Sequence, residues 1–253
     1  MKSIKELYKI GNGPSSSHTM GPKKAALLLK EKYPTADLYK IILYGSLAFT
    51  GKGHLTDKII LEALKPSNVE IIFNKEIKEL KHPNTMDLIA LKNEEELGKF
   101  RAYSIGGGSI QIEGEDFQEE QDIYDFTTYT DIKNNCKEKN ISLLEYIYSQ
   151  EDKYLIEYLK IVWQTMKKTL EEGLEQEGLI PGRLKIPKKA KTLYSKELDN
   201  ENAELKRTRL LTAYAYATSE QNASGGMIVT APTCGASGVL PAVLYYLYKQ
   251  ENV

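Results

Sequence analysis

The chain has 253 residues, 41% of them hydrophobic and 27% charged, which is enough for one large domain or two small ones. Acidic and basic residues nearly cancel, 35 against 34, so a general nucleic-acid surface is disfavoured. No run approaches the roughly 18 apolar residues of a membrane span, and residues 1–13 lack a signal-peptide core. Two cysteines, Cys136 and Cys234, are too few for a disulfide framework. We therefore expect a cytoplasmic protein that binds neither nucleic acid nor membrane.

The first 112 residues carry a mixture of helical and strand patterns. Residues 22–31 read as a helix opened by Pro22, which the first turn of a helix tolerates. Residues 56–64 also have helical spacing. Runs rich in apolar and β-branched residues predict strands over 40–48, 69–73 and 86–91, and on both sides of the triple glycine within 100–112. This alternation predicts an α+β domain over residues 1–112.

The second half of the sequence is helical after a polar connection. Residues 113–140 are polar and charged, and we interpret them as a linker or a solvated loop. Apolar residues recur at helical spacing over 142–176, and further helices are predicted over 204–218 and 241–248. The pattern predicts a helical domain over residues 141–253. We expect the apolar positions of its last helix to be exposed and prone to association, namely Val243, Leu244 and Leu247.

Two glycine-bounded polar loops hold two of the three histidines. Residues 11–21 read GNGPSSSHTMG and precede a predicted helix, so their amides and hydroxyls could bind a carboxylate or a phosphate. Residues 45–57 read GSLAFTGKGHLTD and hold the second histidine. His18 and His54 are candidate proton carriers, because the pKa of a histidine lies near neutrality. An ordinary polar turn that caps the helix explains residues 11–21 equally well.

Residues 222–241, NASGGMIVTAPTCGASGVLP, surround Cys234 with small side chains ahead of an apolar helix. A thiolate near a helix N-terminus is stabilised by the helix dipole, which suits a nucleophile or a metal ligand. A lone cysteine among small residues is also common as simple packing. Two other segments indicate turns: SIGGGSI at 104–110, where a ligand could approach the backbone, and the residues around His82.

Several of these motifs, in this order, resemble a known family. GPSSSHTMGP, GSLAFTGKGHLTD, HPNTM and SIGGGSI resemble the small N-terminal domain of the iron–sulfur-dependent bacterial L-serine dehydratases. The long segment LTAYAYATSEQNASGGMIVTAPTCGASGVLPAVLYYL is similar to the start of the helical catalytic domain of the same single-chain enzymes. The resemblance covers nearly the whole chain. It implies an L-serine ammonia-lyase that forms pyruvate and ammonia, with a [4Fe–4S] cluster as Lewis acid.

The resemblance also implies which residues form the site. His18 and His54 would be the catalytic residues, and one of them would be the base that removes the α-proton. Cys234 would be the metal ligand, whereas much of the family has its cluster-binding cysteine three positions later, where this chain has Ser237. The substrate-binding residues would be Ser16, Ser17, Thr19, Thr56, Asp57, Asn222, Ser224, Thr233 and Gly235.

The catalytic domain of the family continues beyond these motifs, so the resemblance implies a chain truncated within that domain. A [4Fe–4S] cluster with an open iron needs about three thiolates, and this sequence offers two cysteines at most. We therefore expect a homo-oligomer, or a partner chain that supplies the missing catalytic half, and we expect the chain alone to be inactive. The alternative is an inactive paralogue or a regulatory module that binds serine or a related amino acid.

Overall fold

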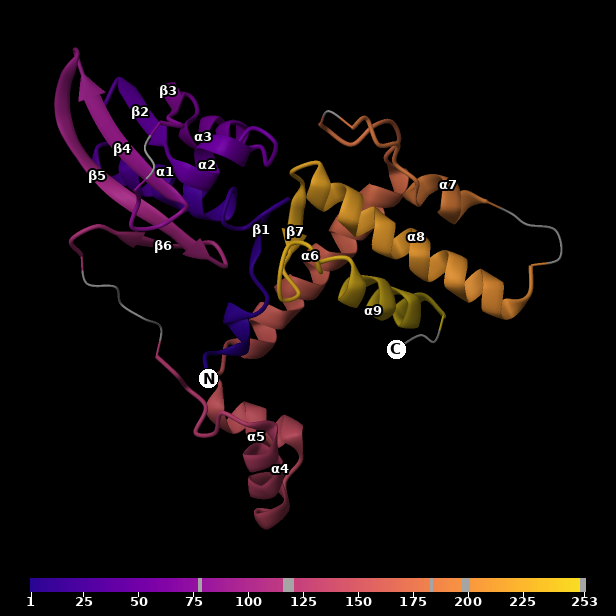
Figure 1. The fold of residues 1–253 in the computed structure, drawn as a ribbon. Helices are drawn as coiled ribbons and strands as arrows, with labels where there is room; N and C mark the ends of the chain where they lie inside the picture. The colour runs from indigo at the N-terminus through magenta and orange to yellow at the C-terminus, as the bar shows by residue number, and fades with distance from the viewer. Residues whose placement is uncertain (77–78, 116–120, 183, 197–200, 251–253) are drawn as a thin grey trace.

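The computed structural model describes residues 1–76, 79–115, 121–182, 184–196 and 201–250 (Figure 1). A five-stranded sheet dominates residues 20–112, which we call the sheet body. Its strand order is β3-β2-β4-β5-β6, with β2 parallel to β3 and the other neighbours antiparallel. The strands are β2 (Leu38–Leu43), β3 (Asn68–Phe73), β4 (Thr85–Lys92), β5 (Glu95–Gly106) and β6 (Ser109–Ile112). The predicted strand pair around the triple glycine is confirmed as the β5–β6 hairpin.

Helices α1 (Met20–Lys32), α2 (Gly45–Thr50) and α3 (Thr56–Leu64) pack on this sheet (Figure 1). Alternate residues of β2 are buried and half-buried, which is the pattern of a strand with one fully covered face. The predicted strand over 40–48 is wrong beyond residue 43. Gly45 has a φ of +52° and its Cα approaches the Pro83 carbonyl too closely for a side chain, so the chain turns there into α2.

Residues 155–250 form a second unit, the helical body, from α6 (Leu155–Glu175), α7 (Ala190–Ser195), α8 (Ala203–Ala223) and α9 (Val239–Gln250). Leu170, Ala217 and Tyr245 are buried where α6, α8 and α9 meet. An α+β unit followed by helices is the predicted fold class, and the structure confirms it. Helix α7 was not predicted; its first amides donate to the carboxylate of Glu220 on α8, a tertiary contact that sequence spacing does not reveal.

The predicted helical run over 142–176 is two helices, α5 (Leu143–Gln150) and α6. Ser142 and Glu145 form a capping box at the start of α5. The break follows from Glu151, which has extended backbone and whose carboxylate accepts hydrogen bonds from Ser3 Oγ at 2.6 Å and Ile4 N at 2.7 Å. A contact between residues so distant in the chain overrides the local helical pattern.

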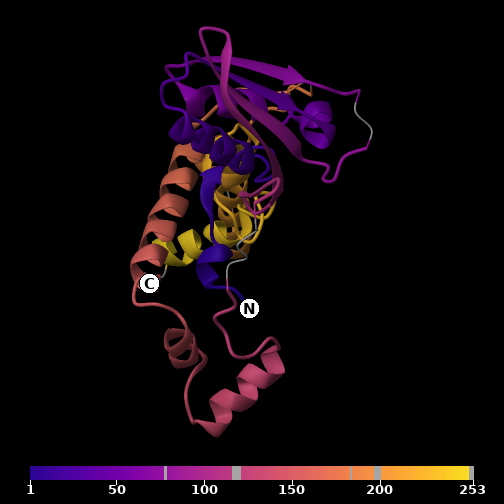
Figure 2. The ribbon, with the colours of Figure 1, turned by 90° about the vertical axis from the view of Figure 1, so that its left-hand side faces the viewer.

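Part of the predicted linker is also helical. Residues 129–138 form α4 (Tyr129–Glu138), whose N-cap Thr128 accepts the Asp131 amide, so the reading of 113–140 as a loop is wrong there. Residues 116–120 of that segment lie outside the described residues. Helices α4 and α5 form a hairpin that projects away from both bodies (Figures 1 and 2). The helix escaped prediction because only Ile132 among its residues is buried, so the apolar pattern is weak.

A small two-stranded sheet between the two bodies positions the site. β1 (Ile10–Asn12) pairs antiparallel with β7 (Met227–Val229), with Gly11 opposite Ile228. The pair lies between the sheet body and the helical body in Figure 1. It sets residues 13–19, which we call the serine–histidine loop, beside residues 222–238, the small-residue segment. Neither strand was predicted, because three residues are too few for a recognisable alternation.

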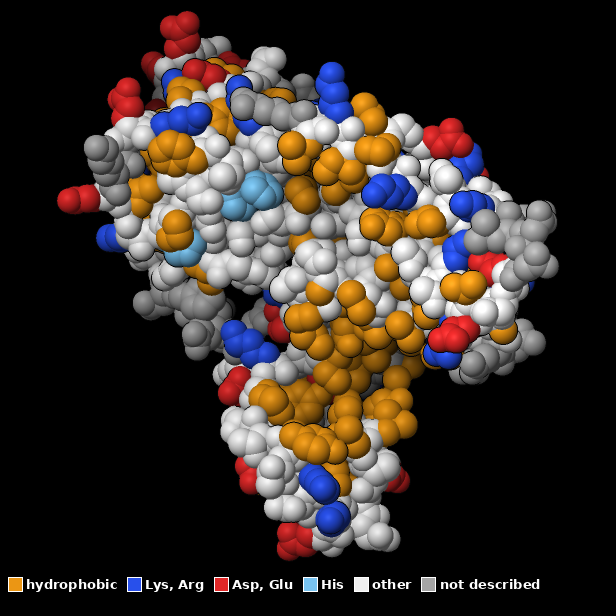
Figure 3. All heavy atoms as spheres, turned by 45° about the vertical axis from the view of Figure 1, so that its right-hand side comes forward, with side chains coloured by type: hydrophobic (Ala, Val, Ile, Leu, Met, Phe, Trp, Pro, Cys, Tyr) orange, Lys and Arg blue, Asp and Glu red, His pale blue; other side chains and the backbone are white. Residues whose placement is uncertain are grey.

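The exposed apolar face predicted for the last helix is present. On α9, the side chains of Val243 and Leu244 are 46% and 37% exposed, and Leu247 is half-buried. Figure 3 shows hydrophobic side chains gathered from the helical body towards the α4–α5 hairpin. Over the described part of the chain, no helix is both long enough and apolar enough to cross a membrane.

Candidate active site

The serine–histidine loop is held at both ends by hydrogen bonds to its surroundings. Gly13 N donates to the Gly226 carbonyl at 3.0 Å, and Asn12 Nδ2 donates to the Gly225 carbonyl at 3.0 Å. At the other end, the buried Thr19 hydroxyl lies within hydrogen-bonding distance of the Asn12 and Ser15 carbonyls, at 2.5 and 2.7 Å. The loop is therefore fixed to β1, to α1 and to the small-residue segment.

His18 is buried and both of its ring nitrogens are engaged by hydroxyl groups. The Ser15 hydroxyl lies 3.2 Å from Nδ1, and Ser46 Oγ and Thr50 Oγ1 lie 3.1 and 2.9 Å from Nε2. Because the Thr50 hydroxyl donates to the Ser46 carbonyl at 2.8 Å, it accepts from Nε2–H of His18. Burial, and then the positive charge that His54 can carry, lower the pKa of His18, which favours the neutral ring.

His54 faces His18 across the junction of α2 and α3. The two ring centroids are 4.4 Å apart with the ring planes tilted by 31°. His54 Nδ1 lies 3.0 Å from the Thr50 carbonyl, an acceptor only, so Nδ1 carries a proton and donates it. In the neutral ring this leaves the lone pair of His54 on Nε2. The left-handed Leu55, with φ +63°, turns the chain from His54 into α3.

The small-residue segment touches the serine–histidine loop at two places. A Cβ at Gly13 would overlap the side chain and carbonyl of Asn222, so the two backbones pack without intervening atoms. Ser16 lies beside the Cys234 thiol, and its backbone and side chain oppose the effect of burial on the pKa of that thiol. Burial is the larger effect and raises that pKa, which favours a neutral thiol rather than the thiolate expected near a helix N-terminus. Helix α9 begins five residues later, at Val239.

Buried polar atoms without a partner occur on both sides of the junction. Within the described part of the chain, hydrogen-bond partners are lacking for Thr56 Oγ1, Asn222 Oδ1 and Ser224 Oγ, three of the predicted substrate-binding groups. Three more lie nearby in sequence: Thr218 Oγ1, Gln221 Nε2 and Ser237 Oγ. An unpaired buried polar atom costs about 1–3 kcal/mol, so these groups can gain stability by binding a polar ligand.

The other predicted site residues make only local contacts or are exposed. The Asp57 carboxylate accepts the adjacent Lys58 amide at 2.9 Å. Thr233 and Gly235 are exposed, and the Thr233 hydroxyl accepts the Ala236 amide at 3.2 Å. Ser17 is half-buried beside Ser16 in the loop.

Sequence reasoning missed three hydroxyl residues that hold His18, namely Ser15, Ser46 and Thr50. Ser46 and Thr50 lie one helical turn apart, so their proximity follows once residues 45–50 are assigned to a helix. The signal was hidden by the incorrect strand over 40–48.

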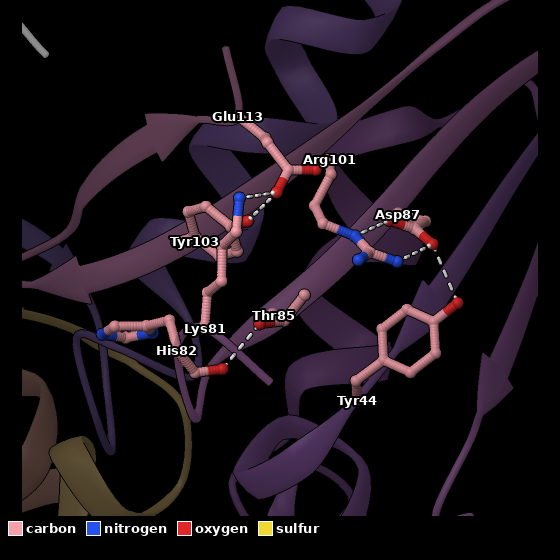
Figure 4. Close-up of polar contacts among 8 residues, drawn as sticks. All are labelled: Tyr44, Lys81, His82, Thr85, Asp87, Arg101, Tyr103 and Glu113. Carbon is pink, nitrogen blue, oxygen red and sulfur yellow. Dashed lines mark hydrogen bonds and ion pairs between the residues drawn. The ribbon is translucent and has the colours of Figure 1, made fainter. Parts of the chain in front are cut away.

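The third histidine belongs to a polar network on the sheet body (Figure 4). His82 Nδ1 accepts the Asn84 amide at 3.0 Å, which fits the turn predicted there. In the same view, Arg101 donates two hydrogen bonds to Asp87, at 2.6 and 2.8 Å, and the Tyr44 hydroxyl donates to that carboxylate. These bonds raise the pKa of Arg101. They join β4 to β5 and leave no unpaired charge for a ligand.

The thiols do not fit a [4Fe–4S] cluster. Such a cluster with an open iron needs about three thiolates, and Cys234 is the one cysteine at this junction. Cys136 lies on α4, in the projecting hairpin, where its thiol contacts the Ser142 carbonyl. No group of three or more histidine, cysteine or carboxylate residues is arranged to hold a metal ion in the described ranges.

The fold and the site define a protein with a small α+β unit and a helical unit, and with histidines, hydroxyls and a thiol at their junction. Two family models match the chain but divide it elsewhere: the serine dehydratase beta chain model matches residues 3–72, and the serine dehydratase alpha chain model matches residues 71–253, which include β4, β5 and β6 of the sheet body. The two models meet within β3. The predicted boundaries at residues 112 and 140 stay predictions.

Curated proteins give the same result. The chain is 33% identical to L-serine dehydratase of Haemophilus influenzae, over 98% of this chain and 67% of that protein. It is also 33% identical to L-serine dehydratase 1 of Escherichia coli, over 100% of this chain and 68% of that protein. L-serine dehydratase of Streptomyces coelicolor is 32% identical to the chain, over 96% of this chain and 65% of that protein. The chain therefore belongs to the serine dehydratase family.

Proposed function

We propose that this chain forms the substrate-binding and proton-transferring part of an L-serine dehydratase, which converts L-serine to pyruvate and ammonia. The observation that carries the proposal is the junction itself. There the paired rings of His18 and His54 lie close to a segment with unpaired buried polar atoms. Relatives named L-serine dehydratase, which cover 96% or more of this chain, supply the substrate class.

The unpaired polar atoms suit the groups of L-serine. Asn222 Oδ1 is an acceptor and suits the substrate ammonium, while the hydroxyls of Thr56 and Ser224 suit its carboxylate or hydroxyl. Each of these atoms is buried, so a substrate that pairs with them recovers hydrogen bonds that the free protein lacks. An analogue without the matching polar group would leave a buried polar atom unpaired, so the site should select against it.

We assign the role of general base to His54. His18 instead has a structural role, in which its ring is bonded to the hydroxyls around it. The Nε2 lone pair of His54 can accept the α-proton, because its Nδ1–H is already donated to the Thr50 carbonyl. His18 cannot do so without losing a hydroxyl contact at either nitrogen. Proton removal and departure of the serine hydroxyl as water give an enamine, whose imine tautomer takes up water to yield pyruvate and ammonia.

The iron–sulfur cluster implied by the resemblance would supply the Lewis acid that activates the leaving hydroxyl. One thiol at the junction does not hold it. We propose that the other thiolates come from outside residues 1–253, whether from further residues of the polypeptide, a second copy or a partner chain, and that the complete enzyme works in the cytoplasm. No step above depends on the geometry of that cluster.

Calorimetry of L-serine binding tests the site, because binding does not require turnover. The wild-type chain should bind L-serine saturably, and Asn222→Ala should weaken binding by about tenfold, the equivalent of one hydrogen bond of about 1.4 kcal/mol. Thr212→Ala, also on α8 but bonded to the Thr208 carbonyl, serves as the matched control and should bind normally. Absence of L-serine binding by the folded wild-type chain would contradict the proposal.

A binding module without chemistry is the second candidate, because the unpaired buried polar atoms suit a ligand such as L-serine without any metal. Iron, acid-labile sulfide and pyruvate formation after anaerobic reconstitution separate the two. About four iron and four sulfide per site, with L-serine-dependent pyruvate, supports the enzyme. Saturable L-serine binding without a cluster, with or without candidate partner chains, supports the module.

A further inference from the structure

A groove of about 880 Å³ runs between the sheet body and the helical body, on elements that flank the serine–histidine loop. One wall is α1 and the turn of the β5–β6 hairpin. The other is the N-terminal segment, β1, Met227 of β7 and Tyr158 of α6. The volume lies within the range of ligand pockets, which favour such interfaces. The residues from Ser15 to Thr19 do not line it, so it is distinct from the candidate active site.

The groove combines an apolar surface with an excess of positive charge. Leu27 and Met227 face it with 44% and 45% of their surfaces exposed. Four lysines and two glutamates line it, and the pairing of Lys5 with Asp152 at 2.5 Å leaves a formal excess of one positive charge. Lys9 is paired with Glu6 at 2.5 Å, and Lys23 donates to Asn12 Oδ1 at 3.0 Å. This composition suits a small molecule with an anionic group and an apolar body.

Two residues of the triple glycine, Gly107 and Gly108, line this groove. Gly106, Gly107 and Gly108 all have positive φ, so the β5–β6 turn presents bare backbone to the groove wall. A Cβ at Gly108 would lie 2.9 Å from Met20 Cβ, which shows how closely the turn packs on the start of α1. A ligand seated between the turn and β1 therefore contacts the residues that set the position of Met20.

Met20 links the groove to the candidate active site. It lines the groove, and it also packs with Ile228 and Cys234 in one buried cluster. Asn12 and Met20 are the residues immediately before and after the loop segment that holds His18, and both line the groove. Asn12 and Met20 therefore join the groove to the two ends of the serine–histidine loop.

We propose that this groove is an effector site for a small organic anion with an apolar body, and that its occupation changes the serine–histidine loop through Met20. The energy for such coupling comes from a ligand that binds one arrangement of the two walls better than another. Binding to the groove is independent of the proposed function, because none of the residues assigned to L-serine lines it.

Fluorescence titration with anilinonaphthalene sulfonate, an apolar anion, tests the binding site. Leu27→Glu should weaken binding by about tenfold or more, through loss of apolar contact and added negative charge. Leu61→Glu is the matched control, because Leu61 on α3 is 42% exposed outside the groove, and it should bind normally. Equal binding by both variants, or loss of binding in Val243→Glu on the apolar α9 face instead, would overturn the proposal.

Nuclear magnetic resonance of the histidine rings tests the coupling. Saturation with the same probe should shift the His18 ring signals in the wild-type chain, with a midpoint equal to the fluorescence midpoint. In Met20→Ala the probe should still bind, and the His18 shift should fall by about half or more, since coupling between sites depends on packed contacts. Probe binding that leaves the His18 signals unchanged would overturn the effector role. His18→Gln should retain probe binding, even if L-serine binding fails.

Discussion

The two sides of the candidate site differ in how completely their polar groups are satisfied. On the sheet-body side, both nitrogens of His18 are bonded to hydroxyls, and His54 Nδ1 donates to a carbonyl. On the helical side, Asn222, Ser224 and Ser237 each have a buried polar atom without a partner in the described residues. The two histidine rings are therefore positioned before any ligand binds, although Thr56 Oγ1 on the same side has no partner in the described residues, whereas a ligand completes the helical side. Changes to the first should therefore alter stability and chemistry, and changes to the second should alter affinity.

The largest effect is expected for the proposed base. His54→Gln should lower L-serine-dependent pyruvate formation by about 10²–10⁴-fold, the usual contribution of a positioned base. His82→Gln is the control, because that ring serves a turn on the sheet body. Turnover should be measured on the reconstituted enzyme with whatever chain completes its cluster. An unchanged kcat in His54→Gln would show that the base lies elsewhere.

The contact between the two sides can be broken at Gly13. Gly13→Ala places a methyl group against the Asn222 backbone, with its carbonyl carbon only 2.9 Å away. We expect overpacking to cost about 1–3 kcal/mol of unfolding free energy and to weaken L-serine binding. Gly235→Ala, whose Cβ would meet nothing closer than Thr233 Oγ1 at 3.9 Å, should be as stable as the parent in denaturant titrations. Equal stabilities would mean that the sides are not packed together in solution.

Removing one buried hydroxyl from each side of the site compares how well the two sides satisfy their polar groups. Thr50→Val removes a hydroxyl bonded to His18 and to the Ser46 carbonyl, and should cost about 1 kcal/mol of stability. Thr218→Val removes a buried hydroxyl with no partner in the described chain, and should leave stability unchanged or raise it. Urea titrations of both variants measure the difference. Equal losses would show that the helical side already satisfies its hydroxyl, for example with bound water.

The smallest effect is a pH dependence that arises from His18. Its folded-state pKa is lowered from the ordinary value of 6.5, so below that pH the unfolded chain takes up a proton that the folded chain resists. The free energy of unfolding should therefore fall as the pH drops from 6.5 to the lowered pKa. His18→Asn should show a shallower decline over the same interval. Parallel curves for the two proteins would contradict the buried neutral ring.

Local sequence patterns were sufficient to predict most helices and strands of the sheet body. The helix over 56–64 was predicted with the bounds that the structure gives, and the hairpin around the triple glycine followed from its flanking strand residues. The elements that were missed depend on distant contacts. β1 and β7 exist because they pair with each other, and α7 begins where Glu220 caps it. No local periodicity can report such pairs.

The sequence indicated which residues belong to the candidate site. How these residues are arranged became clear only from the fold. The two histidine loops were singled out because glycines and hydroxyls flank them, and the structure brings their rings together. The tautomer of His54 is set by the Thr50 carbonyl, a contact that no sequence pattern indicates. The sequence left open whether Cys234 is a ligand or a packing residue; burial raises the pKa of its thiol, and its role stays a prediction.

Side-chain resonances followed during an L-serine titration test the central claim most directly. If the two sides close around the substrate, the Asn222 amide and the His54 ring should both shift with one saturation midpoint. That midpoint should match the dissociation constant from calorimetry. L-serine binding that shifts neither group, or that shifts His54 and leaves Asn222 unchanged, would contradict a site shared between the sheet body and the helical body.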